Sequence, residues 1–216
     1  MTAAFGNKND PNAIAKPGPD TPPSPVEKPP QGGKRHLDKN GKLIINQEGL
    51  EQAKHFEGCY LKAYIDPVGV PTIGYGRIVY PDGRKVRMGD TCTQAQADAW
   101  LIEDLYGEGA KYVRAFLDDS VERELSDDQF SALCSFTFNR GAGRFRDYVA
   151  VFLNRRDFTG AINSLVSINW AGADRKYLLG LDRRRWAERL LWEGKDWRAV
   201  DTVKKFQDFK ARGYRA

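Results

Sequence analysis

The stretch FEGCYLKAYIDPVGVPTIGYG, residues 56–76, contains the three side chains that decide how this 216-residue chain is interpreted. Glu57 lies at its start, followed at once by a glycine. Asp66 comes nine residues later, in a turn before Pro67, and Thr72 a further six residues on, where a glycine-punctuated strand is expected to begin. Two carboxyl groups and a hydroxyl in this order suit a reaction in which one acid protonates a leaving oxygen and a second group manages water.

The residues around this stretch predict a helix followed by a small sheet. Asn46 is a suitable N-cap and Gly58 a suitable terminator for a helix over 47–57, with Glu57 on its inward face. Between residues 60 and 86 the apolar residues become β-branched and aromatic and are interrupted by Pro-Gly turns, which predicts a small antiparallel sheet.

Helical patterns resume after this sheet. Thr93 begins a capping box for a long helix, and Ser126 begins a second one for a helix that stops at Gly141. Shorter helices are expected from about Tyr148, Phe158, Arg183 and Val200. The fold class is therefore α+β.

The spacing of Glu57, Asp66 and Thr72, the flanking Glu-Gly and Thr-Ile-Gly-Tyr-Gly, and the C-terminal half together resemble the phage-type lysozymes, the endolysin family best known from bacteriophage T4. The resemblance covers residues 47–197. It implies a two-lobed fold, with a small β-containing lobe and a helical lobe joined by a long helix, and a cleft between the lobes.

The resemblance also assigns the catalytic roles. Glu57 is expected to be the general acid, Asp66 to activate or place water, and Thr72 to help hold that water. Read alone, these residues have ordinary alternatives: a structural ion pair for Glu57, a turn starter for Asp66 and a plain strand residue for Thr72. An arginine from the run 183–185 is expected to approach the acid.

Sugar binding is implied for a second set of residues, on the strand and at the end of the helix before Gly141. These residues are Gly74, Tyr75, Gly76, Ile78, Phe138 and Asn139. Phe138 is expected either to stack on a sugar or to be core, and Asn139 to bond an acetamido group. The tryptophans at 170, 186, 192 and 197 are predicted to be core.

Bulk composition excludes several classes of protein. The chain is 41% hydrophobic with a net charge of +5, and it contains neither a membrane-spanning apolar run nor a secretory signal core. The charge suits an anionic wall polymer, and the resemblance leaves no role for nucleic acid. No HExxH or Cys/His cluster is present, so neither a metal nor a cofactor is expected. Cys59, Cys92 and Cys134 are predicted to be reduced and mostly buried.

The chain divides into three parts by composition. Residues 1–40 hold eight of the eleven prolines and are predicted to form an extended arm, either a solvated tail or a docking segment for an immunity, tail or secretion partner. Residues 41–199 are the expected lysozyme-like domain, and residues 200–216 a basic helical extension.

The resemblance implies a muramidase that cleaves the β-1,4 bond between N-acetylmuramic acid and N-acetylglucosamine of peptidoglycan, with inversion. It would be made in the bacterial cytoplasm and act in the periplasm after release or delivery. The alternatives are a lysozyme effector delivered by a phage tail or secretion machine, and a non-catalytic peptidoglycan-binding module with the same fold.

Overall fold

The computed structural model of the chain describes residues 34–213, and its first helix, α1 (Gln47–Glu57), has the predicted ends. The Asn46 side chain accepts a hydrogen bond from the Gly49 N–H. At the other end Gly58 adopts a φ of 69° and donates its N–H to the Lys54 carbonyl. A positive φ suits glycine, so α1 stops directly after Glu57 and leaves that side chain on its last turn.

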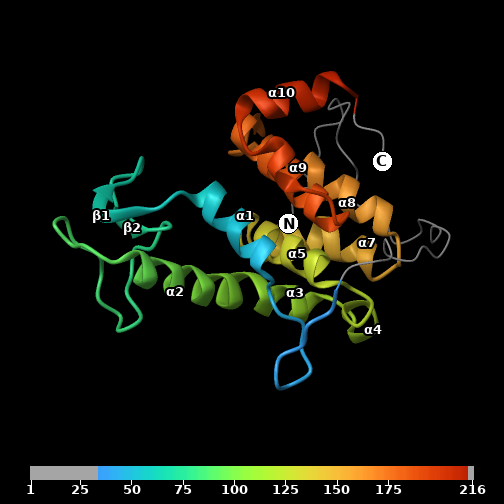
Figure 1. Cartoon of the computed structure of the whole chain (residues 1–216), viewed down its shortest axis with the longest axis horizontal. Helices are drawn as coiled ribbons and strands as arrows, with labels where there is room; N and C mark the ends of the chain where they lie inside the picture. Colours follow the sequence, from blue (N-terminus) through green and yellow to red (C-terminus); the bar gives the residue numbers. More distant parts are fainter. Residues whose placement is uncertain (1–33, 214–216) are drawn as a thin grey trace, which may run out of the picture.

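The small lobe is built on the antiparallel pair β1 (Tyr60–Ile65) and β2 (Pro71–Gly74), as predicted. Tyr64 pairs with Thr72 and Ile65 with Pro71. The isolated bridges Val79–Lys85 and Lys62–Thr91 extend this pair into a thin layer. Figure 1 shows this layer projecting away from the helical lobe.

A long helical segment connects the two lobes (Figure 1). It consists of α2 (Gln94–Asp104), the π-helical turn η1 (Leu105–Ala110) and α3 (Lys111–Phe116). The predicted capping box at Thr93 opens it. At Gly109 a Cβ would lie 2.8 Å from the Cys134 carbonyl oxygen, so glycine allows the segment to pack closely on the helical lobe.

The helical lobe surrounds α5 (Asp127–Arg140), which starts at the predicted Ser126 capping box and stops at Gly141. Phe130, Phe136 and Leu133 of α5 are buried in the largest apolar cluster of the described chain. The helices around it are α4 (Asp119–Glu122), α6 (Ala142–Phe145), η2 (Arg146–Ala150), α7 (Val151–Leu153), α8 (Phe158–Ser167) and α9 (Leu179–Trp192).

Two helix starts differ from the predicted positions. Helix α9 begins at Leu179 rather than near Arg183, because its N-cap is Leu178, which makes no side-chain cap and leaves no signal in the sequence. A helix does start at Phe158, but the one expected near Tyr148 is part of η2. Before α9 the chain forms the hairpin β3 (Trp170–Ala171) and β4 (Lys176–Tyr177).

The C-terminal element η3 (Trp197–Val200) packs on α9, and α10 (Val203–Ala211) packs on η3. Phe206 is buried in a cluster with Trp197. Arg198 forms ion pairs with Glu48 and Glu51 of α1. The predicted core position is confirmed for Trp192 and Trp197, which are buried, whereas Trp170 and Trp186 are half-buried.

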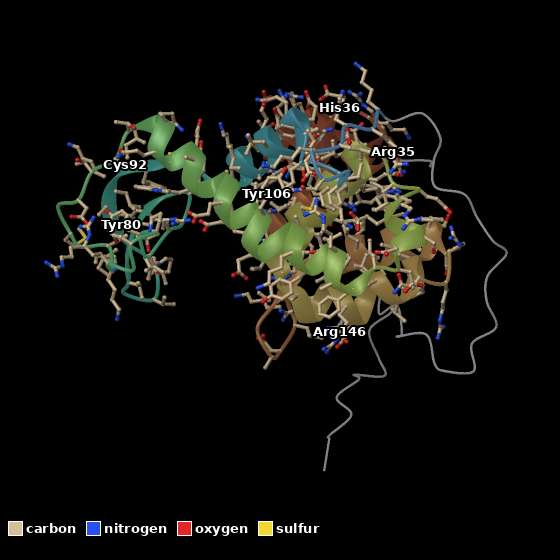
Figure 2. The ribbon with its side chains drawn as sticks, turned by 90° about the horizontal axis from the view of Figure 1, so that it is seen from below. Arg35, His36, Tyr80, Cys92, Tyr106 and Arg146 are labelled. Atoms are coloured by element: carbon tan, nitrogen blue, oxygen red, sulfur yellow. The ribbon has the colours of Figure 1, made fainter. Side chains whose placement is uncertain are left out.

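The three cysteines are free, as predicted, but only Cys134 is buried. Cys59 and Cys92 are half-buried, so the expectation that the thiols are mostly buried is wrong. Both lie in or beside the small β lobe and belong to none of the apolar clusters of the described residues; Figure 2 places Cys92 and Tyr80 in that lobe.

The proline-rich residues 1–33 lie outside the described residues, but residues 34–40 contact the domain. The His36 N–H donates to both carboxylate oxygens of Asp127, at 2.8 and 2.9 Å, and its ring Nδ1 lies 2.5 Å from Asp127 Oδ2. The Asp127 side chain is only 2% exposed. Figure 2 shows His36 and Arg35 on the helical lobe. The boundary at residue 40 stays a prediction, which these contacts make testable.

Removing residues 1–33 is expected to leave the melting temperature unchanged, whereas removing residues 1–40 lowers it. The longer deletion strips the hydrogen-bond donors from the buried Asp127 carboxylate, at a cost of about 1–3 kcal/mol. Thermal unfolding followed by circular dichroism compares the two truncations. Equal melting temperatures would place residues 34–40 outside the folded domain.

Candidate active site

Glu57 pairs directly with an arginine from the opposite part of the chain. Arg184 Nη1 of α9 donates to Glu57 Oε1, and the two residues are 127 positions apart in sequence. The Arg184 side chain is 4% exposed and that of Glu57 is 21% exposed. Of the arginine run 183–185, it is therefore Arg184 that approaches the carboxyl group.

A second layer of buried charges holds Arg184. Glu188 Oε1 accepts from Arg184 Nε at 3.3 Å, from Arg185 Nη2 at 2.6 Å and from Ser135 Oγ at 3.0 Å. The side chains of Arg185 and Glu188 are fully buried. The guanidinium group that pairs with Glu57 is therefore itself held in place by the buried Glu188 carboxylate.

Asp66 occupies the turn between β1 and β2. Its Oδ1 accepts from the backbone N–H groups of Val68, at 3.0 Å, and Val70, at 2.8 Å. The Asp66 N–H also donates to the Val70 carbonyl. These bonds are the expected turn chemistry, and they use only one carboxylate oxygen, so Oδ2 is left with no described protein donor.

Thr72 lies beside this turn, on β2. It is 3% exposed, and its Oγ1 donates to the Val70 carbonyl at 3.0 Å. Because that bond fixes the hydroxyl proton, the lone pairs of the oxygen remain available as acceptors.

The pKa of Tyr64, on β1, responds to the charges of both carboxyl groups. Burial raises the pKa of Tyr64, and so do the nearby charges of Tyr60, Asp66 and Glu57. The Tyr64 phenol is therefore close enough to both carboxylates for their charges to disfavour its ionisation. Sequence reasoning missed this residue, although its pairing with Thr72 follows from the hairpin register.

A cavity of about 510 Å³ opens beside Glu57. Its walls come from the end of α1, the end of α5 and the start of α9. The lining residues are His55, Phe56, Glu57, Asn139, Leu178, Leu179, Gly180, Leu181, Arg183 and Arg184. Of the nine predicted site residues, this cavity brings together Glu57 and Asn139.

The predicted strand residues have different surroundings. Gly74 is buried with a φ of 63°, and a Cβ there would lie 3.4 Å from the Ala97 side chain, so α2 closes it off from an approaching ligand. Gly76 and Ile78 are exposed. Phe138 is partly buried against the Ala53–Leu101–Leu105 cluster, which favours its interpretation as core.

Tyr75 belongs to a polar cluster that ties the β lobe to α1 and α2. Its hydroxyl donates to Asp98 Oδ1 at 3.0 Å, Gln94 Nε2 donates to the same oxygen at 2.7 Å, and Lys54 Nζ lies 2.7 Å from Oδ2. Burial opposes ionisation of Asp98, but the bonds from Lys54, Gln94 and Tyr75 outweigh it and hold the pKa of Asp98 below 3.8.

Replacing Asp98 by asparagine is expected to destabilise the protein by about 1–2 kcal/mol at pH 7. Because the folded-state pKa is depressed, this contribution is present above pH 4 and is lost as the pH falls through the folded-state pKa. Urea unfolding of both proteins between pH 7 and pH 2 tests this. The exposed Asp119→Asn variant is the control. A stability difference that stays constant with pH would contradict the assignment.

Between residues 34 and 213 no three His, Cys, Asp or Glu side chains are grouped in a way that could hold a metal ion. Within the same range no helix is both long and apolar enough to cross a membrane.

Comparison with known proteins supplies the family. The family model for phage lysozyme matches residues 54–188, which include the predicted catalytic residues and Arg184. The chain belongs to the phage lysozyme family. Its fold class, α+β with two lobes, agrees with that of its structural neighbours.

Individual family relatives and neighbours match along most of their length. The endolysin of Acyrthosiphon pisum secondary endosymbiont phage 1 is 36% identical over 156 residues, covering 70% of this chain and 99% of the relative. The solved endolysin from Escherichia coli O157:H7 phage FAHEc1 has a TM-score of 0.61 and 31% identity, over 70% of this chain and 94% of that one.

A muramidase domain is among the structural neighbours of this phage lysozyme family member. That domain, of SpmX from Asticaccaulis excentricus, has a TM-score of 0.59 and 31% identity, and the match covers 69% of this chain and 97% of the domain. Elements η3 and α10 lie C-terminal to residues 54–188, the segment that the family model matches.

Proposed function

We propose that this phage lysozyme family member is a muramidase, which hydrolyses the β-1,4 bond between N-acetylmuramic acid and N-acetylglucosamine in peptidoglycan with inversion at the anomeric carbon. The observation that carries the proposal is the position of Glu57 in the wall of a 510 Å³ cavity, paired with Arg184. The family match and the neighbouring muramidase domain support the substrate class.

In the proposed reaction Glu57 protonates the glycosidic oxygen as the bond to the leaving sugar breaks. Its Oε1 is occupied by Arg184, so Oε2 is the oxygen that donates the proton. As the glycosidic bond breaks, positive charge develops at the anomeric carbon and the ring oxygen. Water attacks the anomeric carbon from the face of the sugar opposite the leaving group.

Asp66 and Thr72 are proposed to hold that water. Asp66 Oδ1 is bound by the N–H groups of Val68 and Val70, which orients the carboxylate and leaves Oδ2 as base. Thr72 Oγ1 donates to the Val70 carbonyl and can accept a hydrogen bond from the same water. A covalent nucleophile would not need this second acceptor.

Inversion gives a specific product. Hydrolysis of a β-linked soluble glycan is expected to release the α-anomer first, which proton NMR detects before mutarotation. Room for the water requires the Glu57 and Asp66 carboxyl groups to stand roughly 6.5–9.5 Å apart. Initial β-anomer, or a glycosyl ester trapped on Asp66, would make Asp66 the nucleophile.

A lysis assay distinguishes the muramidase from the alternative, a non-catalytic peptidoglycan-binding module. Addition of the purified protein to permeabilised bacteria is expected to reduce turbidity. Sedimentation of the protein with intact walls and no fall in turbidity would favour the binding module. Within the muramidase proposal, the protein acts in the periplasm after release or delivery, and residues 1–40 are the segment proposed to bind an immunity, tail or secretion partner.

A further inference from the structure

Arg185 and Glu188 form an ion pair with no access to solvent, directly behind the cavity wall. Arg185 Nη2 lies 2.6 Å from Glu188 Oε1, and both side chains are 0% exposed. Burial lowers the pKa of Arg185 to about 10, so its guanidinium stays charged at neutral pH. Burying two charges is costly, and such pairs rarely add net stability over apolar residues of similar volume. Another role is therefore expected.

The same Arg185 nitrogen contacts a residue of the cavity. Nη2 donates to Asn139 Oδ1 at 3.1 Å. A guanidinium group can only donate hydrogen bonds, so the atom of Asn139 that faces it must be the carbonyl oxygen. The amide nitrogen then points the other way, and no residue between 34 and 213 accepts a hydrogen bond from it. Asn139 lines the cavity beside Glu57, whereas Arg185 does not.

One carboxylate oxygen connects this arrangement to the acid. Glu188 Oε1 also accepts from Arg184 Nε, at 3.3 Å, and Arg184 holds Glu57. Glu188 thus fixes two neighbouring guanidinium groups, one directed at the Glu57 carboxyl and the other at the Asn139 amide.

We infer that Arg185, held by Glu188, is a positioning residue that fixes the Asn139 amide with its N–H₂ group facing the cavity, where it donates to the carbonyl oxygen of a substrate acetamido group. This inference rests on the proposed function, since it assumes an N-acetylated glycan in the cavity. The contact between Asn139 and an acetamido group is the one that the family resemblance implies; the new assignment is that Arg185 selects the orientation of the Asn139 amide.

A double-mutant cycle tests the coupling. Arg185→Met leaves Glu188 bonded to Arg184 and Ser135, and Asn139→Ala removes the amide. Each variant is expected to lower kcat/KM on soluble peptidoglycan glycans by about tenfold, mainly through KM, which corresponds to one lost hydrogen bond. The double variant is expected to lose about tenfold as well, because both changes remove one contact. A loss of about a hundredfold in the double variant would mean independent effects and overturn the inference.

Asn139→Asp tests the orientation without touching Arg185. The aspartate keeps an acceptor for Arg185 but has no N–H₂ group, so it is expected to fold normally and to lose about tenfold in kcat/KM, like Asn139→Ala. Wild-type activity in this variant would contradict the donor role.

The matched control is Arg189→Met, on the same helix, where the arginine pairs with Glu193 and Asn163. It is expected to leave kcat/KM within about twofold of wild type, because Arg189 does not line the cavity. A wild-type protein that releases no saccharide ends would instead contradict the proposed function itself.

Discussion

Replacing Glu57 by glutamine is expected to remove almost all activity on peptidoglycan, lowering the rate by about 10² to 10⁴, the contribution of a general acid. The amide is nearly isosteric with the carboxylic acid, and its oxygen can still accept from Arg184. It cannot release a proton to the glycosidic oxygen. Release of reducing ends from purified peptidoglycan measures the loss.

The control for this prediction is Glu48→Gln, in the first turn of the same helix. Glu48 bonds Trp197 and Arg198 and does not line the cavity. Both variants are expected to keep the wild-type circular dichroism spectrum. A Glu57→Gln protein with wild-type folding and activity within a few-fold of wild type would exclude Glu57 as the acid.

The second large effect is expected for Asp66→Asn. Asparagine can keep its oxygen towards the N–H groups of Val68 and Val70, so the turn survives. The group facing the water becomes an N–H₂ donor, which cannot take up a proton. The activity should fall by about 10² to 10⁴, the range for a lost general base.

Asp82→Asn is the matched control for Asp66, because Asp82 Oδ1 likewise accepts a hydrogen bond from a backbone N–H two residues on, that of Arg84. Its substitution is expected to leave activity near wild type. If both variants lost activity equally, the effect would come from disturbing turns of the β lobe rather than from a lost base.

Local signals in the sequence were sufficient for most of the fold. The N-caps Asn46, Thr93 and Ser126 and the terminators Gly58 and Gly141 were predictable because a cap depends on residues within one turn. The start of α9 was not, because Leu178 makes no side-chain cap. The partial exposure of Cys59 and Cys92 was also missed, because it depends on tertiary packing: neither residue belongs to an apolar cluster of the described residues.

The candidate site was predictable only where it is local in sequence. Glu57, Asp66 and Thr72 belong to one helix–turn–strand segment, so their order and spacing are visible. Which arginine reaches Glu57 depends on the rotation of α9 against α5 and α1, contacts that span 127 positions between Arg184 and Glu57. Residues 183–185 are all arginine, so the sequence does not show which of the three pairs with Glu57.

Product analysis of digested peptidoglycan tests the central claim most directly. Purified walls are treated with the protein, the new reducing ends are reduced with borohydride, and the fragments are identified by mass spectrometry. A muramidase is expected to yield fragments that end in N-acetylmuramitol, absent after treatment with Glu57→Gln. Fragments ending in N-acetylglucosaminitol or in 1,6-anhydro-muramic acid, or walls with no new saccharide ends, would contradict hydrolysis of the proposed bond.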